Sequence, residues 1–109
     1  MSKIVTTTIA SGESTSGFVT TADRQRNFEV GSLVLEGTYT NTSFDVQVEI
    51  DGTFYDVYDT FGNKFSISVS NGKHSLPADV FKDSTVLRLK GASNELAERT
   101  IKFLLVDMI

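Results

Sequence analysis

Residues 43–59 read SFDVQVEIDGTFYDVYD, and this stretch decides the fold class. Its first half alternates apolar and polar side chains, which is the period of a strand with one buried face. The apolar members are Phe44, Val46, Val48 and Ile50. Asp51-Gly52 suits the positive φ values of a tight turn, and the β-prone residues 53–59 can return beside the first strand. The stretch therefore predicts a β-hairpin.

Signals of the same kind continue on both sides of the hairpin. Residues 64–70 alternate apolar and polar side chains between turns at 60–63 and 71–72. Weaker patterns predict strands at residues 3–9, 17–21, 28–39, 84–90 and 99–106, and one short helical turn at 78–82. About eight short strands joined by Gly, Asn and Asp turns indicate an all-β fold, a single antiparallel β-sandwich that is jelly-roll-like. We expect one domain over residues 1–109, with residues 1–10 as an N-terminal arm or an edge strand.

Length and composition exclude several kinds of chemistry. The chain has 109 residues, no cysteine and a formal charge of −4, so disulfides, Cys-ligated zinc and thiol nucleophiles are excluded. The ten Lys and Arg residues form no basic run, and nucleic acid is not an expected partner. No window approaches the roughly 20 apolar residues of a membrane helix, and no signal-peptide stretch opens the sequence. We expect a soluble protein, made without secretion and without a membrane partner.

No set of side chains matches a catalytic or metal site. His74 is the only histidine. Without a nucleophile motif such as G-x-S-x-G, a surface histidine beside a turn is the simpler interpretation. Carboxylates gather around the hairpin, where they could form a calcium cage or a glycosidase pair; they are Asp45, Glu49, Asp51, Asp56 and Asp59. Their spacing does not match an EF-hand loop. This mismatch favours the interpretation that the carboxylates lie on solvated strand faces and in turns. We expect no enzyme activity, no cofactor and no metal.

The hairpin and the turn after it are unusually aromatic, with Phe54, Tyr55, Tyr58 and Phe61 close together. On a strand Phe54 and Tyr58 share one face and Tyr55 shares the other with Val57, so one pair faces away from the core unless a second surface covers it. An outward pair could contact another protein or support sugar rings, although the chain lacks tryptophan, the usual sugar platform. The alternative is a strand buried on both faces. The sequence leaves these interpretations equally open.

Three segments together carry a family resemblance. They are DGTFYDVYD at residues 51–59 with Gly62 beyond it, Leu76-Pro77 with Phe81 beyond it, and AERTI at residues 97–101. With these segments the chain resembles a group of small tailed-bacteriophage virion proteins encoded among head and structural genes. The resemblance implies a compact β-sandwich that decorates or cements the capsid.

The resemblance also implies partners. These are the major capsid protein and further copies of the chain, most simply as a trimer, on the surface of a virion whose parts are made in the host bacterial cytoplasm. The absence of cysteine suits that reducing compartment. A head–tail or tail accessory protein is an alternative of the same class, and a sugar-binding β-sandwich module is an alternative of another.

Two apolar groups are the predicted contacts between subunits. The first consists of Phe54, Tyr55 and Tyr58 in the aromatic segment. The second is the C-terminal pair Met108 and Ile109, because a sequence seldom ends on exposed apolar residues.

Two further groups complete the predicted protein interface. Ser2 and Lys3 belong to residues 2–8, which would reach toward the shell and add a strand to a neighbour. Arg24 and Arg26 form a basic pair in the polar segment 21–27 and would make salt bridges to an acidic partner at the rim of the contact.

Overall fold

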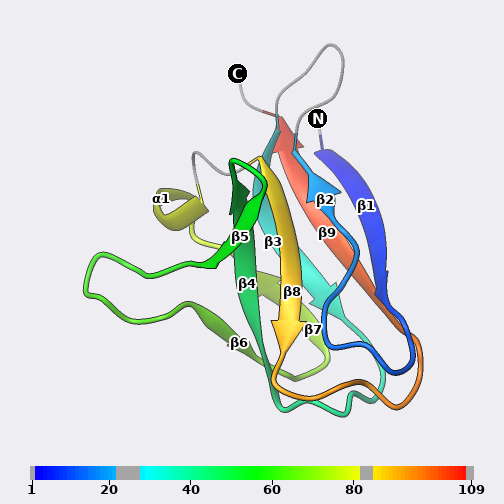
Figure 1. Ribbon diagram of the computed structural model, residues 1–109. Helices are drawn as coiled ribbons and strands as arrows, with labels where there is room; N and C mark the ends of the chain where they lie inside the picture. The colour runs from blue at the N-terminus through cyan, green and yellow to red at the C-terminus, as the bar shows by residue number, and fades with distance from the viewer. Residues whose placement is uncertain (1, 22–27, 82–84, 108–109) are drawn as a thin grey trace.

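The computed structural model describes residues 2–21, 28–81 and 85–107, which form nine strands and one helical turn (Figure 1). The strands are β1 (Ser2–Ile9), β2 (Val19–Thr20), β3 (Phe28–Leu35), β4 (Ser43–Ile50), β5 (Thr53–Asp56), β6 (Ser66–Ser68), β7 (Gly72–Ser75), β8 (Val86–Gly91) and β9 (Arg99–Asp107), and the helical turn is α1 (Ala78–Phe81). All strand pairs are antiparallel. The predicted all-β class is confirmed.

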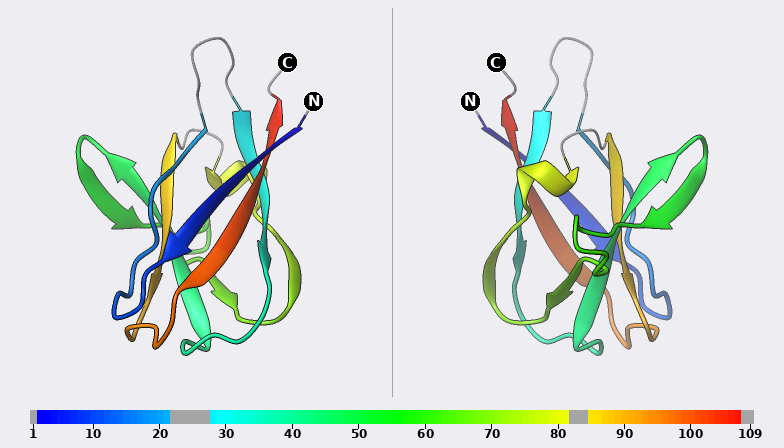
Figure 2. Two further views of the ribbon diagram at one scale, coloured as in Figure 1. Left: turned by 90° about the vertical axis from the view of Figure 1, so that its right-hand side faces the viewer. Right: turned by 90° about the vertical axis from the view of Figure 1, so that its left-hand side faces the viewer.

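The strands pair in a nested order along the chain. β1 pairs with β9, β2 with β8, β3 with β7, and β4 with both β5 and β6. Two further pairings, β3 with β9 and β4 with β8, join these pairs into two sheets. One sheet has the order β1-β9-β3-β7, and the other has the order β2-β8-β4-β5 with β6 on β4. The two sheets stack as the layers seen in Figure 2, and this rolled arrangement of nested strands is a jelly-roll sandwich.

The core lies between the inner faces of the two sheets. On β9 the side chains of Ile101, Phe103 and Leu105 are fully buried, while Lys102 between them is exposed. Such alternation is what a strand with one covered face requires. Phe81 of α1 is buried at one end of the core, as expected of the short turn after Leu76-Pro77.

The hairpin predicted from residues 43–59 is present. Asp51 and Gly52 have φ values of 54° and 84°, the backbone conformation that the turn sequence predicted. Phe44, Val46 and Val48 face the core, but Ile50 is 61% exposed. It is exposed because the tip of the β4–β5 hairpin extends away from the opposite sheet (Figure 2).

A buried carboxylate joins the loops at one end of the sandwich. Glu95 is fully buried and accepts hydrogen bonds from the backbone N–H groups of Thr40 (2.8 Å) and Asn41 (3.0 Å) and from Arg99 Nε (2.8 Å). Its own backbone carbonyl accepts a bond from Gly12 N at 2.8 Å. The β1–β2, β3–β4 and β8–β9 loops are thus held together, at the bottom of Figure 1.

The hydrogen bonds decide the ionisation of Glu95. Burial by itself raises the pKa of a carboxyl group, but the donors from Thr40, Arg99 and Asn41 outweigh it and lower the pKa of Glu95 from 4.5 to about 2. The side chain is therefore a carboxylate at neutral pH.

The structure differs from the sequence-based expectations at several places. Strand β7 was not predicted, because its sequence GKHS has no apolar alternation, and His74 lies within it rather than beside a turn. The strand expected at 53–59 ends at Asp56, and the strand expected at 28–39 ends at Leu35. Of the two alternatives expected for the N-terminal residues, an arm or an edge strand, the structure shows the edge strand, because residues 2–9 form β1 at the edge of the four-stranded sheet.

Candidate functional site

Residues 57–65 form a finger that leaves the five-stranded sheet between β5 and β6 (Figure 1). β5 pairs with the second half of β4 and β6 with the first half. Both strands therefore occupy the same edge of β4, and the chain between them projects sideways. We call residues 57–65 the aromatic finger because it carries Tyr58 and Phe61.

Backbone and side-chain hydrogen bonds hold the aromatic finger in one shape. Tyr58 and Lys64 form a β-bridge, and Phe65 N donates to the Val57 carbonyl at 2.7 Å. At the turn, Asp59 Oδ1 accepts hydrogen bonds from Phe61 N at 2.9 Å and Asn63 N at 3.0 Å. An aspartate that bonds to nearby backbone in this way stabilises a turn. The finger is thus ordered before any partner binds, which lowers the entropy cost of binding.

The base of the aromatic finger is anchored to the sandwich. Lys64 Nζ lies 3.2 Å from Asp45 Oδ2 on β4, and Ser66 Oγ donates to Asp45 Oδ1 at 2.7 Å. The hydrogen bond and charge of Asp45 raise the pKa of Lys64, which stays protonated at neutral pH. On the inner side the Phe65 ring packs edge-on against Phe81, with 5.1 Å between ring centroids.

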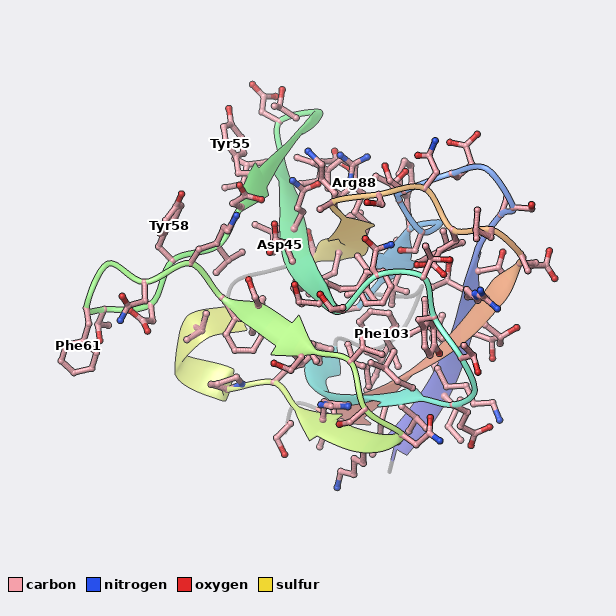
Figure 3. The ribbon with its side chains drawn as sticks, turned by 90° about the horizontal axis from the view of Figure 1, so that it is seen from below. Asp45, Tyr55, Tyr58, Phe61, Arg88 and Phe103 are labelled. Atoms are coloured by element: carbon pink, nitrogen blue, oxygen red, sulfur yellow. The ribbon has the colours of Figure 1, made fainter. Side chains whose placement is uncertain are left out.

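The tip of the finger presents apolar surface to solvent. Phe61 is 88% exposed and Tyr58 is 59% exposed, and both project from the finger in Figure 3. Tyr55, on the neighbouring β5, is 51% exposed. These rings add little to the chain's own core. Exposed aromatic side chains on a rigid support are typical of a protein contact.

Phe54 is placed differently from the other predicted aromatic contacts. It lies on the outer face of the five-stranded sheet, where its ring centroid is 5.1 Å from that of Phe18 and the guanidinium of Arg88 lies 4.0 Å above it. Arg88 Nε donates to Gln47 Oε1 at 2.8 Å, and Gln47 Nε2 donates to Asp56 Oδ1 at 3.0 Å. Phe54 is therefore half-buried by contacts within its own chain.

The remaining predicted interface residues are scattered. Ser2 and Lys3 lie in β1, opposite Val106 and Leu105 of β9. Four predicted contact residues lie outside the described part of the chain: Arg24, Arg26, Met108 and Ile109.

Phe61 is the most exposed large apolar side chain on the described surface, yet it was not among the predicted contacts. The available signal was its position just before Gly62, a turn glycine with a φ of 84°, because a turn seldom buries its side chains.

The described residues contain no arrangement that matches the other candidate sites considered in the sequence. Within residues 2–21, 28–81 and 85–107, no three Asp, Glu or His side chains are grouped so that they could hold a metal ion. The His74 ring lies 2.9 Å from the Ser70 carbonyl, four residues away in the chain. None of the described helices has the length and apolar character needed to cross a bilayer.

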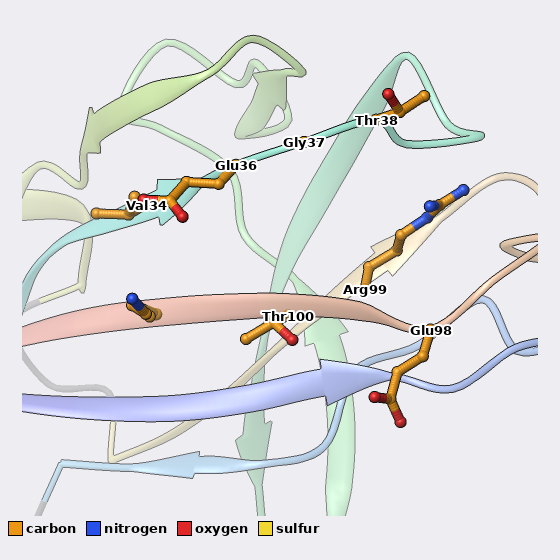
Figure 4. A pocket seen from close by; sticks show the side chains of 8 residues that line it. Val34, Glu36, Gly37, Thr38, Glu98, Arg99 and Thr100 are labelled. Atoms are coloured by element: carbon orange, nitrogen blue, oxygen red, sulfur yellow. The ribbon is translucent and has the colours of Figure 1, made fainter.

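A crevice of about 240 Å³ lies beside the β3–β4 loop and the start of β9 (Figure 4). It is lined by charged and small residues that include Glu36, Glu98 and Arg99, and no aromatic ring lines it. Arg99 is already paired with the buried Glu95. The crevice therefore lacks the ring platform that a sugar site would use.

Comparisons with known proteins show similarity at the level of the fold. No family model matches the chain, and no curated protein matches it. Among solved structures, the crystal structure of the SPBc2 prophage-derived protein YomS is similar, with a TM-score of 0.61 at 11% sequence identity. The match covers 96% of this chain and 94% of YomS, so the two share the whole sandwich.

We expect Asp59→Ala to loosen the aromatic finger without unfolding the sandwich. The substitution removes the acceptor of the Phe61 and Asn63 amides, at a local cost of about 1 kcal/mol. Hydrogen exchange of these two amides should become about fivefold faster, while core amides on β9 keep their protection. Thr60→Ala, in the same turn, is the control. Unchanged exchange in the Asp59 variant would show that Asp59 does not order the finger.

Proposed function

We propose that the protein is a bacteriophage structural protein that decorates or cements the capsid. The observation that carries the proposal is the rigid aromatic finger. It exposes Phe61 and Tyr58 to solvent, outside the hydrophobic core. The family resemblance of residues 51–62 and the whole-length similarity to a prophage-derived protein support a phage origin. The proposed partners are the major capsid protein and further copies of the chain, the proposed location is the virion surface, and no enzyme activity is proposed.

A decoration protein stabilises a shell by adding interfaces across the joints between capsomers. Internal DNA pressure must then break these additional contacts before the shell opens. Each copy requires only modest contacts, because an oligomer that binds several capsomers at once gains effective concentration after the first contact. An antiparallel jelly roll with projecting loops is suited to this role, since its rigid sheets hold the contact residues in place.

The proposal is tested by counting copies on particles. The purified protein is mixed with phage particles that lack it, the particles are pelleted, and the bound copies are counted by quantitative mass spectrometry. We expect saturation at hundreds of copies and greater resistance of the particles to heat. Saturation near a dozen copies would instead indicate a neck or tail protein, and no binding would contradict a virion role.

The variant His74→Ala tests, in the same experiment, whether the histidine is needed for binding or stabilisation of the particles. The hydrogen bond described above joins the His74 side chain to the backbone of Ser70, four residues away in the chain. We therefore expect the variant to bind particles and to stabilise them as the wild type does. Loss of either property would show that the histidine has a role that the proposal omits.

A further inference from the structure

The outer face of the four-stranded sheet carries an apolar groove. It has a volume of about 210 Å³, and apolar side chains form its floor: Ile4 of β1, Val34 of β3 and Leu104 of β9. Ile4 is 66% exposed, and Lys73 and Lys102 also line the groove. The groove is on the face of the sheet opposite the core, because Ile4, Val34 and Leu104 alternate with inward residues on their strands.

The groove also contains a buried hydroxyl group without a partner. Ser32 lines the groove, its side chain is 1% exposed, and Oγ has no hydrogen bond with any of the described residues. An unpaired buried hydroxyl is unfavourable and uncommon in folded proteins. A ring that packs over Ser32 therefore breaks no existing hydrogen bond of this hydroxyl.

The aromatic finger matches the groove in size and in charge. A cavity of about 150 Å³ accommodates a benzene molecule, so a groove of 210 Å³ accommodates the Phe61 ring. The finger carries Asp59 at its turn, and Asp56 precedes it at the base. Its one basic residue, Lys64, is already paired with Asp45. The charges of Lys73 and Lys102 in the groove are therefore opposite to that of Asp59 at the turn of the finger.

We propose that the groove binds the aromatic finger of a second copy of this chain, with the Phe61 ring packed on Ile4, Val34 and Leu104. The finger points away from its own sandwich (Figure 3), so it does not fill the groove of the same molecule. Finger and groove are different surfaces, and the contact between copies is therefore heterologous. Contacts of this type repeat from copy to copy and produce a closed ring or a chain.

The inference rests on the self-association part of the proposed function and is tested on the purified protein alone. Sedimentation equilibrium measures the mass of the wild type and of the variants Phe61→Asp and Ile4→Glu. Both substituted side chains are exposed, so both variants should fold, as circular dichroism can verify. We expect a concentration-dependent mass above that of the monomer for the wild type and a monomer for each variant. Leu96→Asp, at an 81% exposed leucine outside both surfaces, should associate like the wild type.

Mixing the two variants separates a heterologous contact from a symmetric one. Phe61→Asp retains an intact groove, and Ile4→Glu retains an intact finger, so an equimolar mixture should form a dimer with one copy of each variant. A mixture that stays monomeric would overturn the proposal, as would a variant that still associates alone. A wild type that remains monomeric up to about 1 mM would also overturn it. Because no phage particle is present, these failures would remove the contact between copies but would leave capsid binding, which the particle experiment tests, undecided by them.

Discussion

Replacing Glu95 with Gln should lower the free energy of unfolding by about 3 kcal/mol at pH 7. Glutamine has nearly the same shape as glutamate but carries no charge. Its amide N–H₂ group is a hydrogen-bond donor, and it replaces a carboxylate oxygen that accepts hydrogen bonds, so donors would face donors. Those donors include Asn41 N and Arg99 Nε. Chemical denaturation measures the change. A loss of this size corresponds to a Tm lower by about 10–20 °C for a domain of this size.

Glu98→Gln is the matched control. Glu98 is an exposed glutamate in the same loop, so the same chemical change at that position should alter stability by less than about 0.5 kcal/mol. Equal effects at the two positions would mean that the hydrogen-bonded carboxylate of Glu95 does not hold the loops together.

The pH dependence of stability should differ between wild type and Glu95→Gln in a defined window. The pKa of Glu95 is lowered from 4.5 to about 2 in the folded chain. Its contribution is therefore complete above the unfolded pKa and is lost as the pH falls from about 5 to about 2. The wild-type advantage should shrink by about 3 kcal/mol over that window. Subtracting the two stability curves removes the other carboxylates, and a constant difference would contradict the assignment.

Phe81→Ala should destabilise the protein by about 4 kcal/mol, because it leaves a cavity where a buried ring closes one end of the core. Phe61→Ala is the same chemical change at an 88% exposed ring and should alter stability by less than about 0.5 kcal/mol. Both are measured by chemical denaturation at low protein concentration, so that self-association does not add to stability. Comparable losses would show that the finger tip contributes to the core.

The Phe81 substitution should also make the aromatic finger less ordered. Phe65, at the base of the aromatic finger, packs edge-on against Phe81, and such ring pairs contribute about 1 kcal/mol beyond their buried area. Amides of residues 57–65 should therefore exchange faster in the Phe81 variant. If Phe81→Ala does not fold, Phe81→Leu keeps most of the volume and allows the same comparison.

The sequence by itself determined the local β structure. The alternation of residues 43–50 marked the buried face of β4, and Asp51-Gly52 marked its turn, because both depend only on backbone geometry and near neighbours. Residues 99–106 were recognised as a strand for the same reason. Local patterns of this kind led to the all-β sandwich without any knowledge of which strands pair.

Only the tertiary structure decided which segments pair with one another and which side chains other segments bury. β7 is a strand because β3 offers it a free edge, although its own sequence has no β pattern. Glu95 looks like one more loop acid in the sequence, and only the meeting of distant loops surrounds it with donors. The aromatic segment left the sheet because β5 and β6 share one edge of β4. Periodicity reports the face of a residue within its own strand, but burial depends on chain segments far away in sequence.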